Sequence, residues 1–467
     1  MGDGPGPAGG GREEGLHDHH HGPCARDPAG PGGGRQMKLY EVPYGKGRQQ
    51  VLLPEDKVSQ VLLPPVTEHP RTVEELMRDA LAHPIGSPKL DKIVRPGEKV
   101  VLVVSDITRT WAMFDKFVPL LVAELNRIGV PDDDMSVIIA TGKHRLNTAA
   151  EKEEILGKDL YCRLKVYDHD PAKEACVYYG TTKRGTPVWI DKRAAAADKV
   201  ILTGGLSPHI YAGFGGGRKS VLPGIAAAES INHNHNMALT DEVGGGVNPD
   251  TSIMRHNGNR VSEDMCDVAA LFRPDFLVNV IVDAGGNFYK IVAGDWYEAW
   301  YQGTKDVMKL QGVATRQKSD VVIVSGGGYP HDISLYQGMK CYAPGAAAFK
   351  QGGILIAVLR CQDMEEPPEF FDSFRYTDML EMEKAVRADF TVPVYVAFYM
   401  CCLARSFTII LVTEPENFAA AKKTGAIPAA TLEEAWQLAR QKLVAQGKQD
   451  YTINIMPYGG DTLPVLG

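Results

Sequence analysis

Apolar runs of four to seven residues, separated by helical stretches, most limit what this chain can fold into. Residues 99–105, 137–140, 164–167 and 200–203 are rich in Val, Ile and Leu, as is typical of strands buried on both faces of a parallel sheet. Residues 114–128 have the apolar spacing of an amphipathic helix. Strands that alternate with helices predict an α/β domain with a mostly parallel sheet.

A second series of such runs follows later in the chain. Residues 320–324, 353–358 and 407–412 predict further strands, and residues 432–444 have helical periodicity. A chain of 467 residues is also too long for one ordinary domain. We therefore expect two α/β domains with mostly parallel sheets, an N-terminal one over residues 37–304 and a C-terminal one over residues 305–467.

The first 36 residues have a different composition. They are Gly, Pro and charged residues with almost no apolar side chains, so burial cannot offset the entropy lost on ordering, and we expect a disordered tail. Residues 17–21 read HDHHH, a tract that either binds nickel or zinc loosely or is solvated without a role. An expression tag is a further reading of this tract.

Composition and net charge indicate which kinds of molecule the protein binds. The chain is 44% hydrophobic and 23% charged, with a net charge of -8, so it has no general attraction for nucleic acid or anionic lipid. We find neither an apolar stretch that could span a bilayer nor the apolar core of a signal peptide. Eight cysteines without a CxxC motif indicate free thiols. These features predict a cytoplasmic protein that binds a small molecule, without nucleic acid or membrane partners.

Polar residues follow three of the predicted strands. Asp106, His144 and His209 each come shortly after an apolar run, at the carboxyl edge where open parallel sheets bind their ligands. We therefore expect these three side chains to face one crevice.

A glycine-rich segment at residues 207–224 contains Gly215, Gly216 and Gly217 followed by Arg218 and Lys219. Such glycines let backbone amides approach an anion, and a helix that begins there would add its positive end. The segment differs from a P-loop because Arg218 stands where that motif needs glycine. Lys219 is then either an attachment nucleophile for a cofactor or a cation that pairs with a phosphate.

Residues 232–236 read NHNHN. The imidazoles of His233 and His235 point the same way in a strand and about 200° apart in a helix. Two histidines without a third protein ligand make a poor zinc site. A metal held mainly by a cofactor would need only one of them.

The run from His209 to Gly224, followed by His235, resembles the nickel-dependent lactate racemase family. Three further segments are similar to motifs of that family. They are residues 106–109 (DITR), 141–145 (TGKHR), and 327–330 (GGYP) with 336–340 (YQGMK). The resemblance covers nearly all of the chain after Met37.

The resemblance implies a two-domain α/β enzyme with its active site in the crevice between the domains. Its cofactor is a nickel-pincer nucleotide, a pyridinium-3-thioamide-5-thiocarboxylic acid mononucleotide, which Lys219 holds covalently beside Gly215, Gly216 and Gly217. By the same resemblance His235 binds nickel, and His144 and His209 are the acid–base pair. Arg109, Gln337 and Lys340 bind substrate, and Asp106 completes the substrate site by orienting its surroundings.

This resemblance implies a racemase or epimerase of lactate or a related 2-hydroxy acid. Removing a proton from the carbon beside a carboxylate is unfavourable, whereas removing hydride gives a planar 2-keto acid that either enantiomer can form. Two histidines suit this task, because both protonation states of imidazole are accessible near pH 7. An arginine suits the substrate carboxylate.

Two residues differ from the family pattern. Trp111 follows Arg109 closely, where relatives often have proline, and the basic Lys143 precedes His144. We expect both to reshape the pocket and to favour a larger or more polar hydroxy acid than lactate.

Three other functions remain open from the sequence. They are a zinc-dependent hydrolase built on His233, His235 and a carboxylate, a non-catalytic nucleotide- or nickel-binding relative, and a metal-storage protein that uses the histidine tail. The leading interpretation also implies three partners that build the cofactor: a carboxylase, a sulfur transferase and a nickel insertase.

Overall fold

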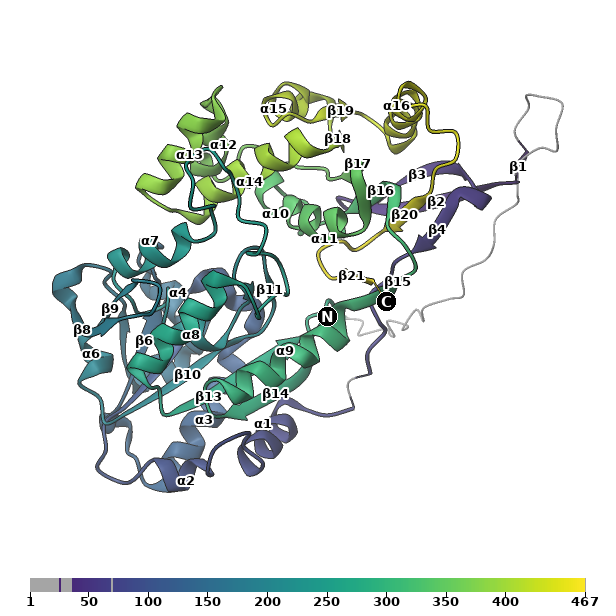
Figure 1. Ribbon diagram of the computed structural model, residues 1–467. Coiled ribbons are helices and arrows are strands. Elements are labelled where there is room, and N and C mark those ends of the chain that lie inside the picture. The colour runs from purple at the N-terminus through teal and green to yellow at the C-terminus, as the bar shows by residue number, and fades with distance from the viewer. Residues whose placement is uncertain (1–24, 27–35, 69, 467) are drawn as a thin grey trace, which may run out of the picture.

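A computed structural model describes residues 25–26, 36–68 and 70–466 of the chain. The predicted tail, with its histidine tract at residues 17–21, lies outside the described residues except for residues 25–26 and 36. Two six-stranded sheets organise the rest, each flanked by helices (Figure 1). The prediction of two α/β units with mostly parallel sheets is therefore confirmed.

The first lobe comprises residues 73–311, and its sheet has the order β14-β13-β10-β5-β6-β7. All neighbours in it are parallel except β13 and β14. Its strands are β5 (Val100–Ser105), β6 (Met135–Ala140), β7 (Lys165–Asp168), β10 (Lys199–Gly205), β13 (Phe276–Val282) and β14 (Phe288–Gly294). Its helices are α1 (Val73–Ala82), α2 (Leu90–Ile93), α3 (Phe114–Ile128), α4 (Ala149–Leu156), α5 (Lys158–Arg163), α6 (Lys192–Ala195), α7 (Ala228–Asn236), α8 (Arg260–Phe272) and α9 (Glu298–Gln311).

The second lobe comprises residues 36–61 and 312–466, and its sheet has the order β19-β18-β17-β16-β20-β4. Every neighbouring pair in this sheet is parallel. Its strands are β4 (Val58–Val61), β16 (Ser319–Ser325), β17 (Phe349–Val358), β18 (Thr408–Val412), β19 (Ile427–Ala429) and β20 (Ile453–Met456). Its helices are α10 (Leu335–Gly338), α11 (Tyr342–Ala347), α12 (Pro368–Asp372), α13 (Met379–Ala388), α14 (Val392–Ser406), α15 (Phe418–Lys423) and α16 (Leu432–Ala445).

Smaller elements complete the described chain. They are the antiparallel strands β1 (Ala25–Arg26), β2 (Gln36–Tyr44) and β3 (Gly47–Pro54), the hairpin β8 (Cys176–Thr181) and β9 (Pro187–Asp191), the pair β11 (Pro208–His209) and β12 (Gly213–Phe214), and the parallel pair β15 (Gly312–Thr315) and β21 (Leu463–Leu466). Short 3-10 helices occur among them, including η2 (Ile107–Ala112), η5 (Gly217–Ser220) and η6 (Met339–Cys341).

Strand β5 shows why the apolar runs become buried strands. Val101 and Val103 pack on the face covered by α8 and α9, whereas Val100, Leu102 and Val104 pack on the opposite face against α1 and α3. A side chain on each face at every second position requires apolar residues throughout the strand. The near-continuous apolar run is therefore the expected sequence of a central parallel strand.

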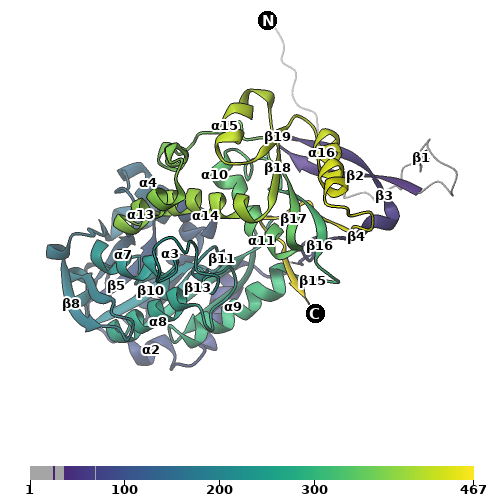
Figure 2. The same ribbon diagram turned by 45° about the horizontal axis from the view of Figure 1, so that its top comes forward.

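One apolar core continues from the first lobe into the second. It includes Val103 and Leu202 of the first sheet, Val322 and Leu355 of the second, and the helix α14. Figure 2 shows α13 and α14 of the second lobe beside α7 of the first, and α13 and α7 are in contact. The two lobes therefore pack through shared apolar surface close to α7.

The N-terminal strands lie with the second lobe. β4 pairs with β20, and Val42 and Val51 of β2 and β3 share a core with α16. Residues 283–304, which directly precede the predicted division between the domains, form β14 and the first part of α9, which continues to Gln311. The predicted division at residue 304 stays a prediction.

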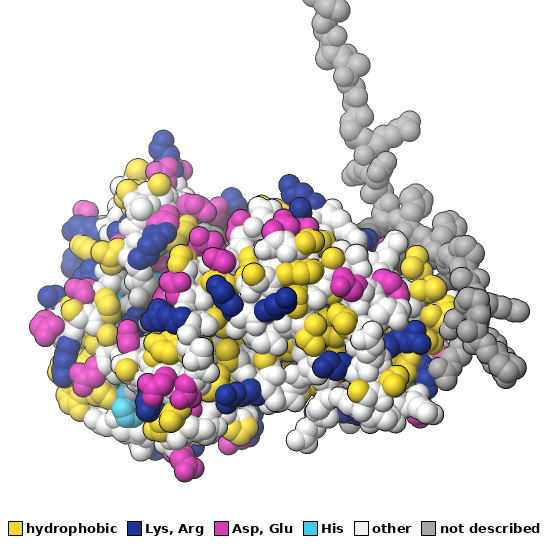
Figure 3. Space-filling view, turned by 90° about the horizontal axis from the view of Figure 1, so that it is seen from above, with side chains coloured by type: hydrophobic (Ala, Val, Ile, Leu, Met, Phe, Trp, Pro, Cys, Tyr) yellow, Lys and Arg dark blue, Asp and Glu magenta, His cyan; other side chains and the backbone are white. Residues whose placement is uncertain are grey.

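Charged side chains of both signs are mixed over both lobes on the face drawn in Figure 3. Among the described residues, the longest apolar helices fall short of what a bilayer crossing requires. The seven described cysteines are all free, as expected.

Candidate active site

The three polar residues predicted at the sheet edge follow adjacent strands. Asp106 comes directly after β5, His144 follows β6, and His209 follows β10, and these strands are neighbours in the order β10-β5-β6. The carboxyl ends of parallel strands share one edge of the sheet, so the fold brings these residues to the same side.

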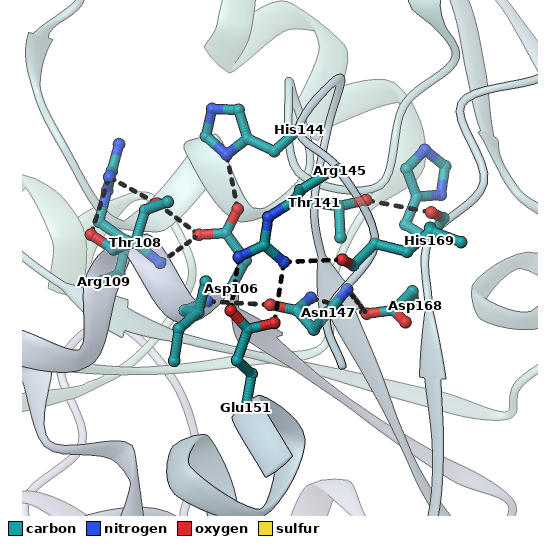
Figure 4. Close-up of polar contacts among 12 residues, drawn as sticks. Asp106, Thr108, Arg109, Thr141, His144, Arg145, Asn147, Glu151, Asp168 and His169 are labelled. Carbon is teal, nitrogen blue, oxygen red and sulfur yellow. Dashed lines mark hydrogen bonds and ion pairs between the residues drawn. The ribbon is translucent and has the colours of Figure 1, made fainter. Parts of the chain in front are cut away.

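Asp106 holds the ring of His144 (Figure 4). The Asp106 Oδ2 atom accepts a hydrogen bond of 2.5 Å from His144 Nδ1, and its Oδ1 atom accepts from the amide and hydroxyl of Thr108. Burial tends to raise the pKa of Asp106, but the bonds from His144 and Thr108 outweigh it and the net pKa is lowered. An ionised Asp106 places the proton of neutral His144 on Nδ1 and leaves Nε2 as a base. Both carboxylate oxygens are thus engaged, which favours the orienting role for Asp106 over direct substrate contact.

The loop that carries His144 is anchored at both ends (Figure 4). The Thr141 hydroxyl donates to the backbone carbonyl of His169 at 3.0 Å, and Arg145 forms a bidentate pair with Glu151 at 2.5 and 2.8 Å. Glu151 also belongs to the capping box that starts α4 at Thr148. These contacts fix the position of an imidazole whose side chain is 44% exposed.

His209 and Lys219 form a direct pair. The His209 Nε2 atom lies 2.8 Å from Lys219 Nζ, and the backbone amide of Ala212 donates to His209 Nδ1 at 3.3 Å. Because Nδ1 accepts, the single proton of a neutral ring must lie on Nε2. The Lys219 nitrogen is then the acceptor, which only an uncharged amine can be. The hydrogen-bond pattern therefore requires Lys219 to be neutral.

The electrostatics around Lys219 agree with this assignment. Burial lowers the pKa of Lys219 well below its usual value, and the positive charges of Arg109 and Arg218 lower it further. Burial also lowers the pKa of His209 well below its usual value. Lys219 makes no ion pair with any residue of the described ranges. A neutral amine of this kind is a nucleophile rather than a fixed cation.

The glycines before Lys219 serve close packing. A Cβ atom on Gly217 would lie 2.5 Å from Trp300, and one on Gly216 would lie 2.7 Å from Asn279 Oδ1. The amide of Gly215 donates to the Ser207 carbonyl, and the amide of Gly217 donates to Asn279 Oδ1.

This arrangement differs from the anion-binding loop that the sequence suggested. Two of the three glycine amides already have acceptors inside the protein, and the expected helix is only the four-residue η5. Binding of the cofactor by Gly215, Gly216 and Gly217 stays a prediction. The triple glycine is explained instead by the side chains of Trp300 and Asn279, which no local pattern indicates.

His235 lies inside α7, so the pair at 233 and 235 diverges as a helix requires. His235 is 2% exposed, whereas His233 lies on the outer side. The Nδ1 atom of His235 is 3.0 Å from Asn234 Oδ1, and its ring meets the edges of Tyr211 and Phe390. Nδ1 donates to the amide oxygen, which leaves the Nε2 lone pair available.

The second lobe contributes Gln337 and Lys340, from α10 and η6. Lys340 Nζ donates to Gln337 Oε1 at 2.5 Å. Lys340 remains accessible to solvent, but desolvation of its ammonium group by the surrounding protein lowers its pKa to about 8, with a further contribution from Arg109 of the first lobe. The same guanidinium influences the pKa of Lys219, His209 and Tyr336, so the predicted residues of both lobes surround Arg109. The Arg109 guanidinium makes no ion pair within the described chain, only hydrogen bonds to the carbonyl and hydroxyl of Thr108.

Several residues at this place were not predicted. Tyr336 of the second lobe and Tyr211 of the first lie near the Arg109 guanidinium. The Tyr211 ring also contacts the rings of Phe390 and Tyr395 across the boundary between the lobes. Arg218 is fully buried, and its guanidinium lies 3.9 Å from the Trp300 ring. Tyr336, Tyr211 and Arg218 lie inside the segments that carry the family resemblance, which was a usable signal, whereas Phe390 and Tyr395 carry none.

The two residues that depart from the family pattern have distinct surroundings. The Trp111 ring packs so closely on Gly205 that a Cβ there would lie 2.5 Å from the ring. Lys143 bonds to Asn232 Oδ1 at 2.9 Å, to the Phe390 carbonyl at 3.1 Å and to the Asp389 carboxylate. Lys143 thus contacts both lobes, and the expectation that it reshapes the pocket stays a prediction.

Comparisons with known proteins agree with this arrangement. The lactate racemase N-terminal domain matches residues 44–245, and the lactate racemase C-terminal domain matches residues 314–462. The chain is similar to a lactate racemase of Thermoanaerobacterium thermosaccharolyticum, with 29% identity over 431 residues that cover 91% of this chain and 98% of that protein. It is 30% identical to a lactate racemase of Lactiplantibacillus plantarum over 361 residues, which cover 74% of this chain and 83% of that protein.

A solved structure supports the same assignment. The lactate racemase apoprotein from T. thermosaccharolyticum superposes with a TM-score of 0.80 at 28% identity, covering 92% of this chain and all of that one. Both domain models match in order, and the relatives are covered over most of their length. On these grounds the chain belongs to the lactate racemase family.

Proposed function

We propose that this protein is a racemase or epimerase of a 2-hydroxy acid that uses a nickel-pincer nucleotide attached to Lys219. The relatives are named lactate racemases, so lactate or a related hydroxy acid is the proposed substrate. The observation that carries the proposal is the neutral Lys219 amine, which accepts a hydrogen bond from His209 Nε2 at 2.8 Å. A lysine that only paired with a phosphate would keep its proton.

The donor set fits such a cofactor. Lys219 offers an uncharged amine for a covalent bond, and His235 offers one imidazole with a free Nε2. Within the described chain, no three His, Cys, Asp or Glu side chains cluster as a metal site. One protein ligand is the number that a metal held mainly by its own cofactor would need.

When bound, the nucleotide supplies a group that reversibly accepts hydride from the substrate. The protein residues bind the substrate and move its proton. Arg109 and Lys340 hold the carboxylate, with Gln337 beside them. His144, oriented by Asp106, accepts the hydroxyl proton of one enantiomer at Nε2, and His209 serves the other. The histidine on the product side would return a proton to the carbonyl oxygen of the planar 2-keto acid, so that the hydroxyl group of the opposite enantiomer forms.

The neutral state of His209 suits a base. Burial holds its pKa well below the usual value, so the ring is neutral at physiological pH. Because its Nε2 proton is donated to Lys219, the proposed role requires that the ring change tautomer and present a free Nε2 lone pair to the substrate. A cation formed there would be unstable beside Arg109. We therefore assign His209 a short-lived protonated state and a rapid return of the proton.

The zinc hydrolase alternative has less support. His233 and His235 diverge on α7, and the buried Asp264 reaches them only through Thr186 and Asn234. A non-catalytic relative would not need a histidine held as a base by Asp106. The metal-storage alternative depends on residues 17–21, which lie outside the described ranges.

The remaining inferences belong to the same proposal. Maturation would require the carboxylase, the sulfur transferase and the nickel insertase that build the cofactor, and we place the protein in the cytoplasm. Its substrate is a small hydroxy acid rather than a nucleic acid.

Mass analysis tests the proposal. The protein is produced together with the three cofactor-building enzymes, and its Lys219 peptide and nickel content are measured. We expect a nucleotide-sized mass increase on that peptide, about one nickel per chain, and loss of optical purity when single enantiomers of hydroxy acids are added. Lys219→Ala should lack both the adduct and the activity. A matured protein without an adduct on Lys219 would overturn the proposal.

A further inference from the structure

Asp264 is a buried carboxylate without a cation. It lies in α8, is 0% exposed, and forms no ion pair within the described part of the chain. Its neighbours Glu263 and Asp267 in the same helix both pair with Arg184. A buried charge left to neutral partners is destabilising compared with an apolar residue of similar size. The carboxylate at this position therefore needs an explanation other than stability.

Three neutral donors surround Asp264. Its Oδ1 atom accepts from the Thr182 hydroxyl at 2.5 Å, and its Oδ2 atom accepts from the Thr186 hydroxyl at 2.6 Å and from Asn234 Nδ2 at 2.9 Å. An ionised carboxylate only accepts hydrogen bonds. Each of these partners must therefore turn a hydrogen toward Asp264, and its other atoms are then oriented as well.

The orientation that Asp264 imposes on Asn234 also determines the hydrogen bond that His235 can make. Asn234 Nδ2 donates to Asp264 and to the Val261 carbonyl at 3.2 Å, so the amide oxygen must face the other way. That oxygen lies 3.0 Å from His235 Nδ1 and can only accept. The ring of His235 must then carry its proton on Nδ1.

The same carboxylate orients His233 in an equivalent way. The Thr186 hydroxyl gives its hydrogen to Asp264, so its oxygen accepts from His233 Nδ1 at 2.9 Å. Both histidines of the NHNHN segment are thus tied to one carboxylate through one intervening polar side chain. His233 is exposed, whereas His235 is buried beside Tyr211 and Phe390.

We propose that Asp264 is a positioning residue which, through Asn234, holds His235 in the tautomer that has a free Nε2 lone pair. The inference rests on the proposed function, in which His235 binds nickel. A free imidazole in water prefers the opposite tautomer, with its proton on Nε2 and no lone pair there. Groups that orient a metal-binding histidine through its other nitrogen commonly change metal affinity 10–100-fold.

The test reads the tautomer directly. In full-length protein without cofactor, nitrogen-15 spectra of labelled histidines report which ring nitrogen carries the proton, with His235→Gln identifying the signal. We expect the wild-type ring to carry it on Nδ1. Asn234→Ala removes the acceptor and should move the proton to Nε2. Asp264→Asn can present a donor to Asn234, which would turn that amide, so a mixture or the Nε2 form is expected.

Thr182→Val is the matched control. It removes one donor from the same buried carboxylate and lowers stability, but Asn234 is untouched, so His235 should keep its proton on Nδ1. If Asp264→Asn does not fold, Asp264→Ser replaces it, because it also removes the carboxylate that orients Asn234. The wild-type tautomer in Asp264→Asn, or in the variant that replaces it, would overturn the proposal.

A second measurement uses matured protein. Nickel loss to a chelator should be about 10–100-fold faster in Asp264→Asn than in wild type or Thr182→Val. Equal rates in all three proteins would also overturn the proposal. A matured wild-type protein without nickel would contradict the proposed function, while the tautomer measurement would still decide the role of Asp264.

Discussion

Lys340 is a residue whose charge can change near physiological pH. Desolvation of its ammonium group and the charge of Arg109 lower its pKa to about 8, so the ammonium is present below that pH and lost above it. If the cation binds the substrate carboxylate, kcat/KM for a hydroxy acid should fall about tenfold per pH unit above pH 8. Rates of the matured enzyme between pH 6 and 10 measure this.

Lys340→Arg is the control for that profile. A guanidinium remains charged throughout this range, so the decrease near pH 8 should disappear even if the overall rate is lower. A decrease at the same pH in Lys340→Arg would assign the titration to another group.

Asp106 determines which nitrogen of His144 is the base. In Asp106→Asn the amide can turn its NH₂ group toward His144 Nδ1, so the ring proton moves to Nε2, where the substrate proton should be accepted. We expect kcat to fall on the order of 10²–10⁴-fold with a smaller change in KM. The variant retains an oxygen that can cap η2 at Thr108, so its melting temperature should change little. A kcat within threefold of wild type would show that this pair is not needed.

At the scale of elements, the turn before Lys219 depends on Gly217. Its φ is +54°, and a Cβ atom would lie 2.5 Å from Trp300. Gly217→Ala should therefore lower the free energy of unfolding by about 2 kcal/mol or more, measured by urea denaturation. Gly215→Ala is the matched variant, because its nearest neighbour is Ser207 Oγ at 3.3 Å and its φ is not positive. Equal losses in the two variants would contradict this account.

The regular elements could be predicted because their signals are local. The apolar run at residues 99–105 became β5 (Val100–Ser105), and the periodicity at residues 114–128 became α3 (Phe114–Ile128). Pairing between distant segments has no such signal. Nothing near Val58 indicates that it will pair with Ile453, so the place of β4 in the second sheet was not predicted.

The site shows the same limit. Asp106, His144 and His209 could be placed at one sheet edge because each follows a strand. The motifs supplied the remaining candidates, whose roles stay proposals. Asp264 and Asn234 could not be found, because a buried polar residue in an amphipathic helix resembles an ordinary surface position until its neighbours are known.

For the whole molecule, several polar contacts join the lobes, among them the bonds from Arg387 to the carbonyls of Thr240 and Glu242 and the bonds of Lys143. Lys143 of the first lobe bonds to the Asp389 carboxylate and the Phe390 carbonyl of the second. Lys143→Met should favour separated lobes and raise KM several-fold with less effect on kcat, because binding must then also close the site. Steady-state kinetics and the radius of gyration from small-angle scattering measure both effects.

Asp389→Asn is the matched variant for Lys143→Met. Asp389 is 69% exposed, so its ion pair should contribute little, and the bonds from Lys143 to Phe390 and Asn232 remain. A KM as high in Asp389→Asn as in Lys143→Met would mean that the surface charge pair, rather than the bond to the Phe390 carbonyl, accounts for the contribution of Lys143 to the contact between the lobes.

The place of β4 has a consequence for how the protein is made. The first sheet draws all its strands from residues 100–294, so it can be completed while later residues are still in the ribosome. The second sheet begins with Val58 and needs Ile453 beside it. Its edge strand therefore has no partner in this sheet until nearly the whole chain has been translated, so the second sheet can be completed only after the first.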